Sequence, residues 1–92
     1  MKIDEKINKS GYTIVKYYAD WCGPCRAMHP TLEKFKESSN VPLIKVDVDK
    51  ESEIAKKYGI RGIPCFIVIE DGEIKSKKIG LQNLDQLIEL VK

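Results

Sequence analysis

Long apolar runs and an excess of charge of either sign are both missing from this chain of 92 residues. No stretch approaches the ~18–20 apolar residues of a membrane-spanning helix, and the first twelve residues lack the apolar centre of a secretory signal. We therefore expect an intracellular, cytoplasmic protein with no membrane association. Lys and Arg total 16 against 14 Asp and Glu, a balance that excludes the basic footprint of a nucleic-acid-binding protein. Hydrophobic residues at 42% and charged residues at 33% are typical of one small globular domain over residues 1–92, which we expect to be a monomer.

Cysteine is also scarce, with Cys22, Cys25 and Cys65 as its three occurrences. A small, odd number of cysteines does not form the disulfide framework of a secreted mini-protein. In a reducing compartment such thiols are catalytic, metal-binding or simply buried. The function therefore depends on what each of the three cysteines does.

Four segments rich in β-branched and aromatic residues predict strands. They cover residues 12–18, 41–48, 65–70 and 73–79. Asp71 and Gly72 separate the last two segments, and this pair is a strong signal for a two-residue hairpin.

Helical periodicity or capping residues predict four helices. Their ranges are 3–9, 22–38 with a kink at Pro30, 51–58 with Asp49 as its N-cap, and an amphipathic C-terminal helix that begins near Asn83 and Gln86. Two strands joined by a crossover helix are expected to be parallel, and the hairpin adds antiparallel strands. The predicted fold class is therefore α/β, a four-stranded mixed sheet in a three-layer sandwich with helices on both faces. Chemistry is expected at the carboxyl ends of the parallel strands.

The motif Trp21-Cys22-Gly23-Pro24-Cys25 stands where the first strand meets the long helix. With Cys22 at the N-cap, the amide of Cys25 would point at the Cys22 sulfur, and Pro24 would suit the first helical turn. The positive end of the helix dipole then favours a thiolate and lowers the pKa of Cys22.

The second cysteine of the motif differs from the first. Cys25 begins an apolar stripe with Met28, Leu32 and Phe35, so it is expected to face inward. This arrangement assigns attack on a substrate disulfide to Cys22 and resolution of the mixed disulfide to Cys25.

Metal binding is the alternative from a different functional class. Cys22 and Cys25 form half of many zinc sites, and Cys65 with His29 could complete a Cys₃His set. A metal or iron–sulfur module that uses the two cysteines, within one chain or shared across a dimer, is therefore an open alternative. The Gly-Pro pair at a strand-to-helix junction favours redox chemistry with no metal.

The sequence resembles the thioredoxin family from about Tyr12 to Val91. The resemblance is carried by WCGPC at 21–25, by Pro30, by KYGIRGIP at 57–64, by the Asp71-Gly72 hairpin and by Gly80. It implies a cis bond between Ile63 and Pro64, and an Ile63 backbone that pairs with a substrate strand. It further implies an apolar surface for substrate docking, formed by Trp21, Gly23, Pro24, Ile63, Pro64 and Gly80.

The activity that the resemblance implies is reduction of protein disulfides without an organic cofactor or metal. The implied partners are disulfide-containing target proteins and, as electron donor, a flavoenzyme of the thioredoxin-reductase type. A glutathione-linked, glutaredoxin-like reductase is the alternative within the class. Gly-Pro between the cysteines and Ile63 before the proline argue against it.

The chain departs from the family pattern in its length before the first strand. Only eleven residues precede that strand, so we expect an initial family strand to be missing. The expected order across the sheet is 41–48, 12–18, 65–70, 73–79.

Two positions near the motif also depart from the pattern. Lys16 replaces a buried aspartate that is thought to exchange a proton with the resolving cysteine. Lys45 on the neighbouring strand matches a lysine common in the family, and Asp47 on the same face could act as counter-ion. We expect Lys16 either to favour thiolates electrostatically, with water or Asp47 moving the proton, or to extend to the rim without affecting the chemistry.

Cys65 stands where the family has threonine, and packing is favoured over a third redox thiol.

Overall fold

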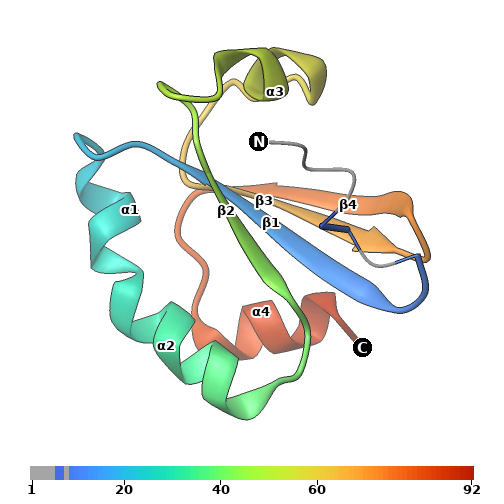
Figure 1. Cartoon of the computed structure of the whole chain (residues 1–92). Coiled ribbons are helices and arrows are strands. Elements are labelled where there is room, and N and C mark those ends of the chain that lie inside the picture. The colour runs from blue at the N-terminus through green and yellow to red at the C-terminus, as the bar shows by residue number, and fades with distance from the viewer. Residues whose placement is uncertain (1–5, 8) are drawn as a thin grey trace.

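The computed structural model describes residues 6, 7 and 9–92, and within them four strands form one sheet. The strands are β1 (Tyr12–Tyr18), β2 (Leu43–Asp47), β3 (Cys65–Glu70) and β4 (Glu73–Ile79). Their order is β2-β1-β3-β4, with β1 and β2 parallel and the other pairs antiparallel (Figure 1). The mixed sheet and the predicted strand order are confirmed. β2 is shorter than predicted, because Pro42 has no amide to donate and Asp47 already begins a turn.

Four helices cover the two faces of this sheet. They are α1 (Gly23–Ala27), α2 (His29–Ser38), α3 (Ser52–Lys57) and α4 (Leu84–Leu90). α1, α2 and α4 lie on one face and α3 on the other, which confirms the three layers (Figure 1). Among the described residues no helix is both long enough and apolar enough to span a bilayer.

Alternate residues of β1 and β3 supply both halves of the core, and β2 adds buried residues to one of them. Toward α1, α2 and α4 the buried side chains are Ile14, Phe66, Val68, Met28, Leu32, Phe35 and Leu87. Toward α3 they are Val15, Tyr17, Ile44, Val46, Cys65, Ile67 and Ile69, with the half-buried Ile54 and Tyr58 packed against them. The sheet therefore separates two environments, and Cys65 belongs to the one that α3 covers.

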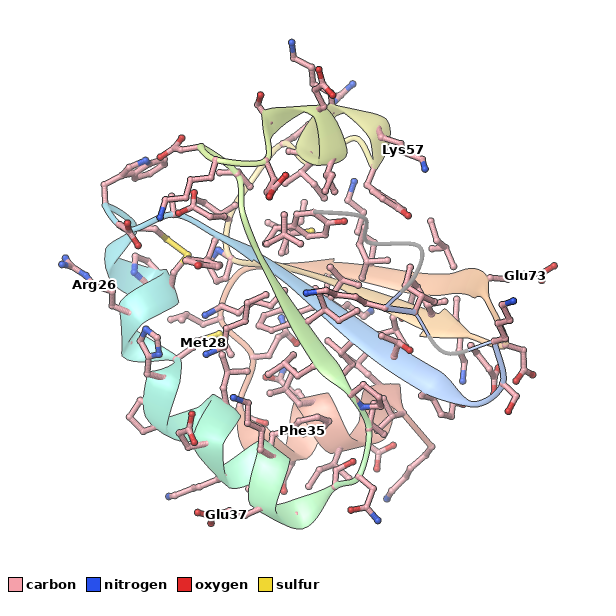
Figure 2. The ribbon with its side chains drawn as sticks, in the orientation of Figure 1. Arg26, Met28, Phe35, Glu37, Lys57 and Glu73 are labelled. Carbon is pink, nitrogen blue, oxygen red and sulfur yellow. A yellow bond between two sulfur atoms is a disulfide. The ribbon has the colours of Figure 1, made fainter. Side chains whose placement is uncertain are left out.

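The predicted single kinked helix is divided in two at Met28. Pro30 has no amide proton, so it cannot donate to the carbonyl of Arg26 four residues earlier. The Met28 amide instead bonds back to the Cys25 carbonyl at 3.3 Å, and α2 resumes with the Leu32 amide on the Met28 carbonyl at 2.9 Å. The apolar stripe still continues across the break, with Met28 and Phe35 directed toward the sheet (Figure 2).

The start of α3 also differs from its prediction. Glu51, rather than Asp49, is the N-cap, and it makes no side-chain capping bond. Asp47 organises the turn before the helix, because its Oδ1 accepts the amides of Asp49 at 2.9 Å and Lys50 at 3.3 Å.

The chain before β1 was predicted to contain a helix over 3–9 and to lack an initial strand. Residues 1–5 and 8 of this segment lie outside the described part of the chain. Residues 6, 7, 9 and 10, which are described, form a turn and bends.

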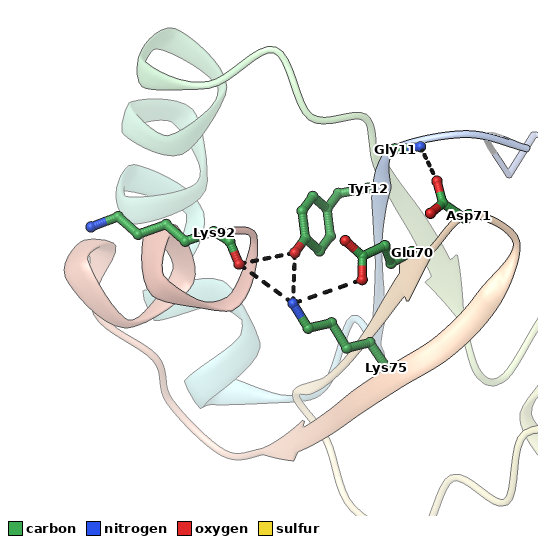
Figure 3. A network of polar contacts seen from close by, with 6 residues as sticks. All are labelled: Gly11, Tyr12, Glu70, Asp71, Lys75 and Lys92. Carbon is green, nitrogen blue, oxygen red and sulfur yellow. Dashed lines mark hydrogen bonds and ion pairs between the residues drawn. The ribbon is translucent and has the colours of Figure 1, made fainter.

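The sheet end remote from α1 is held by polar contacts (Figure 3). The Gly11 amide donates to Asp71 Oδ1 at 2.7 Å, and Asp71 itself has the positive φ of a tight hairpin turn. The Tyr12 hydroxyl donates to the main-chain oxygen of Lys92 at 2.9 Å and accepts from Lys75 Nζ at 2.6 Å. These contacts tie the C-terminal end of the chain to β1 and β4.

α4 begins with the predicted capping pair. Asn83 Oδ1 accepts the Gln86 amide and Gln86 Oε1 accepts the Asn83 amide, both at 2.8 Å, which forms a complete capping box.

Candidate active site

A disulfide joins Cys22 and Cys25 at the start of α1, directly after β1 (Figure 2). Cys22 is the N-cap and Pro24 lies in the first helical turn. The Cys25 amide donates to Cys22 Sγ at 3.2 Å, and the two Cα atoms are 5.3 Å apart. The outer sulfur thus lies at the positive end of the α1 backbone, the geometry that the motif predicted.

The two cysteines differ only slightly in exposure in this oxidised form. Cys22 is 4% exposed and Cys25 is 1% exposed. Both pack with Ala19, and the half-buried Val48 and Ile63 lie against them. The predicted order of exposure is present, but the covering side chains leave little of either cysteine exposed in this oxidised form.

Trp21 lies on the surface beside the disulfide, 68% exposed, so it is not a core residue. Its indole N–H donates to Asp49 Oδ2 at 2.8 Å. Sequence reasoning missed this partner, since it assigned Asp49 to the cap of α3. An acidic residue at the end of the neighbouring parallel strand, at the same edge as the motif, was the available signal.

The loop before β3 brings a second group of predicted residues to the site. The bond between Ile63 and Pro64 is cis, as the resemblance implied, and the Gly80 amide donates to the Pro64 carbonyl at 2.8 Å. Gly80 has φ of 99°, a conformation that favours glycine. A groove of about 170 Å³ runs beside Trp21, and its lining is Trp21, Val48, Ala55, Ile60, Arg61, Gly62 and Ile63. Gly23 and Pro24 are exposed between the two cysteines.

Lys16 is fully buried behind Cys25, on the sheet face that α1 and α2 cover. Its Nζ donates to the Cys25 carbonyl at 3.3 Å and lies 5.5 Å from the centre of the Tyr18 ring. Burial, followed by the charge of Lys45, lowers the pKa of Lys16 to about 8. With 1% exposure the side chain does not extend to the rim.

Asp47 shares this face of the sheet but has a different set of partners. Its Oδ1 is bonded to the two amides of the following turn. In the described part of the chain it forms no ion pair with Lys16 or Lys45. Among the described residues, the Asp47 carboxylate therefore has no direct contact with Lys16 or Cys25 through which it could transfer a proton.

Cys65 is buried on the other face of the sheet, opposite Tyr17 on β1. Burial raises the pKa of its thiol, and the Lys77 charge opposes this only in part. Among residues 6, 7 and 9–92 no three His, Cys, Asp or Glu side chains gather as metal ligands, so Cys65 and His29 do not join the cysteine pair.

A mixed sheet that presents a Cys-x-x-Cys disulfide at a helix N-terminus, next to a cis-proline loop, defines a thiol–disulfide oxidoreductase. The comparisons with known proteins narrow this class. The Thioredoxin family model matches residues 2–92, and the chain belongs to the thioredoxin family. Its activity is that of a protein-disulfide oxidoreductase.

Individual relatives agree over nearly the whole chain. Thioredoxin of Mycoplasmoides gallisepticum is 36% identical over 92 residues, which cover 99% of this chain and 92% of that one. Thioredoxin of Bacillus subtilis is 36% identical over 83 residues, 88% of this chain and 80% of that one. A solved mutant thioredoxin from Halobacterium salinarum superposes with a TM-score of 0.90 at 34% identity, and the match covers 98% of this chain and 80% of that one.

Proposed function

We propose that Cys22 is the nucleophile and Cys25 the resolving thiol in the reduction of target-protein disulfides. The observation that carries this assignment is the hydrogen bond from the Cys25 amide to Cys22 Sγ at the N-cap of α1. An amide donor and the helix dipole both favour negative charge on that sulfur. Cys25 has no such donor described at its sulfur, and it is the more enclosed of the two.

The reaction has two exchange steps. The Cys22 thiolate attacks one sulfur of the target disulfide, and the other target sulfur leaves as a thiolate that takes up a proton. The Cys25 thiolate then attacks Cys22 Sγ, which forms the Cys22–Cys25 disulfide and releases the second target thiolate. Two electrons pass to the target, and the product is the oxidised form that the structure shows.

Substrate docking is proposed at the groove beside Trp21. Its apolar lining and the adjacent Ile63 backbone suit an extended peptide whose main chain pairs beside the disulfide. Gly23, Pro24 and Gly80 complete this surface, since none of them places a bulky polar side chain near the sulfurs. Pro64, which follows Ile63 in the chain, is itself buried.

The wider setting is proposed on chemical grounds. The exchange needs no organic cofactor or metal, because the thiols themselves carry the electrons. A flavoenzyme of the thioredoxin-reductase type would return electrons to the pair. A reducing cytoplasm suits the free, buried Cys65, and the protein would act there as a monomer in electron transport.

A coupled assay on insulin disulfides tests the function. NADPH with thioredoxin reductase is compared with NADPH, glutathione reductase and glutathione. Turnover with the first donor supports the proposal, and turnover with glutathione alone would replace it by the glutaredoxin-like alternative. Cys22→Ser should abolish turnover, whereas Cys25→Ser should accumulate a mixed disulfide that is visible by mass spectrometry without reductant.

A further inference from the structure

A pocket of about 270 Å³ lies behind the disulfide, separate from the groove beside Trp21. It is lined by Lys16, Tyr18, Ala19, Asp20, Cys25, Arg26, His29 and Lys45. The two lysines come from the sheet, and Arg26 and His29 come from α1 and α2. The pocket therefore lies between the sheet and the two helices, with both lysines on its sheet side.

The two lysines are direct neighbours across parallel strands. Lys16 and Lys45 are Cα partners in the β1–β2 register, and like charges in that position repel each other. Lys16 is 1% exposed, and the Cys25 carbonyl is its one hydrogen-bond acceptor in the described part of the chain. An ammonium group has three donors, so two of them have no protein acceptor among the described residues.

Acidic groups do not compensate this charge. Asp20 is the one acidic residue in the lining, and it is exposed and forms no ion pair with the lysines among the described residues. Asp47 is held by turn amides. The Arg26 side chain points away from the sheet, which leaves it at the outer edge of the pocket (Figure 2).

We propose that this pocket binds a small oxyanion of the phosphate or sulfate class between the ammonium groups of Lys16 and Lys45. A buried cation without a counter-ion carries a large desolvation penalty, and an anion in contact with it relieves that penalty. The oxygens of the anion would accept the unused Lys16 donors in charge-assisted hydrogen bonds. The cavity volume accommodates a tetrahedral oxyanion together with water.

One consequence rests on the proposed function. Cys25 lines the same pocket, so a bound anion and a Cys25 thiolate compete for the positive charge of Lys16. By linkage the anion binds more weakly when that thiolate forms, and it binds the oxidised protein more tightly. Binding to the oxidised protein can be measured without any turnover, so its failure would not be confused with failure of the reductase activity.

The test is the thermal midpoint of the oxidised protein in phosphate, sulfate or acetate, with ionic strength held constant by chloride. We expect phosphate and sulfate to raise Tm by about 7 °C when present at ten times the dissociation constant. Anion concentrations of about 10 mM keep the general effect of salt exclusion on stability small. A larger Lys16-dependent rise in acetate would overturn the assignment to a tetrahedral oxyanion and would point to a carboxylate ligand. Equal midpoints in all four anions would overturn the proposal.

Matched variants separate the site from general effects of salt. Lys16→Met should remove the anion-dependent rise in Tm, while Lys56→Met, an exposed lysine on α3, should keep it. An equal rise in the wild type and in Lys16→Met would also overturn the site.

If Lys16→Met does not fold, Lys45→Met replaces it in the same experiment, and it should likewise reduce the anion-dependent rise in Tm. On the wild type, phosphate should shift NMR resonances of Lys16, Lys45 and Cys25 with saturation. Shifts confined to other surface lysines would contradict the pocket.

Discussion

Lys16 places a positive charge in the interior next to the resolving cysteine. Its side chain is fully buried, its charge faces that of Lys45, and its acceptor is a neutral carbonyl. In a chloride buffer we expect Lys16→Met to raise the free energy of unfolding at pH 7 by about 3 kcal/mol, since one pKa unit corresponds to roughly 1.4 kcal/mol. Denaturant unfolding measures this gain, and Lys56→Met is the control that should show little change.

The same residue predicts a pH dependence of stability. The folded pKa of Lys16 is about 8, below its ordinary value of 10.5. Between these values the unfolded chain binds more protons, so wild-type stability gains a rising contribution as pH increases. The advantage of Lys16→Met is therefore complete below pH 8 and lost by about pH 10.5. An advantage that stays constant over this range would show that the buried charge is not its cause.

Trp21 is held in place by one hydrogen bond, and the chain has a single tryptophan. We expect Asp49→Ala to free the indole, which lowers its fluorescence anisotropy and raises KM for insulin about 3-fold with little change in kcat, a loss below 1 kcal/mol. Asp49→Asn keeps an oxygen acceptor and should stay close to the wild type. Unchanged anisotropy and KM in Asp49→Ala would remove Asp49 from substrate docking.

At the scale of elements, α4 depends on its first turn. Its seven residues are few for an isolated helix, so the capping box and the burial of Leu87 hold it against the sheet. Asn83→Ala removes one capping bond and should lower the free energy of unfolding by about 1 kcal/mol. Asn40→Ala, in an exposed loop, is the comparison, and equal losses in the two variants would contradict a specific capping effect.

Element prediction from sequence succeeded where local chemistry decided the backbone. The Asp71-Gly72 turn adopts the positive φ values that those residues tolerate, and strands β1, β3 and β4 have their predicted bounds. The break at Met28 was missed because the apolar stripe continues across it. The spacing of apolar residues indicates which face of a helix is buried. It does not indicate where a helical hydrogen bond is missing, as it is between Pro30 and the Arg26 carbonyl.

The site was predictable in its sulfur chemistry and less so in its surroundings. The redox pair Cys22 and Cys25 was predicted from its spacing and from its position between a strand and a helix. The cis bond before Pro64 was predicted from the family resemblance. The Trp21–Asp49 bond depends on how two strand ends meet in space. The partner of Asp47 was also not predictable from strand alternation. Asp47 shares a face with Lys45, but its carboxylate accepts the Asp49 amide in the turn that follows β2. Which of several possible donors a carboxylate accepts depends on their positions in the folded chain, which the sequence pattern does not specify.

At the scale of the whole molecule, the two ends of the sheet have different properties. At one end, hydrogen bonds among Tyr12, Lys75 and Lys92 connect β1, β4 and the C-terminal end of the chain (Figure 3). At the other end the disulfide, the cis-proline loop and two separate cavities meet. The reactive groups thus lie on loops and a helix start at one end of the sheet, where binding residues are commonly found.

Disulfide reduction by this protein depends most on the unequal chemistry of its two sulfurs. Its direct measurement is the pH dependence of iodoacetamide alkylation in the reduced protein, with the modified cysteine identified by peptide mapping. We predict that Cys22 is alkylated first, with a midpoint well below the ~8.5 of free cysteine, while Cys25 reacts slowly and Cys65 reacts only after unfolding. Equal alkylation of Cys22 and Cys25, or a Cys22 midpoint at the free-cysteine value, would contradict the mechanism.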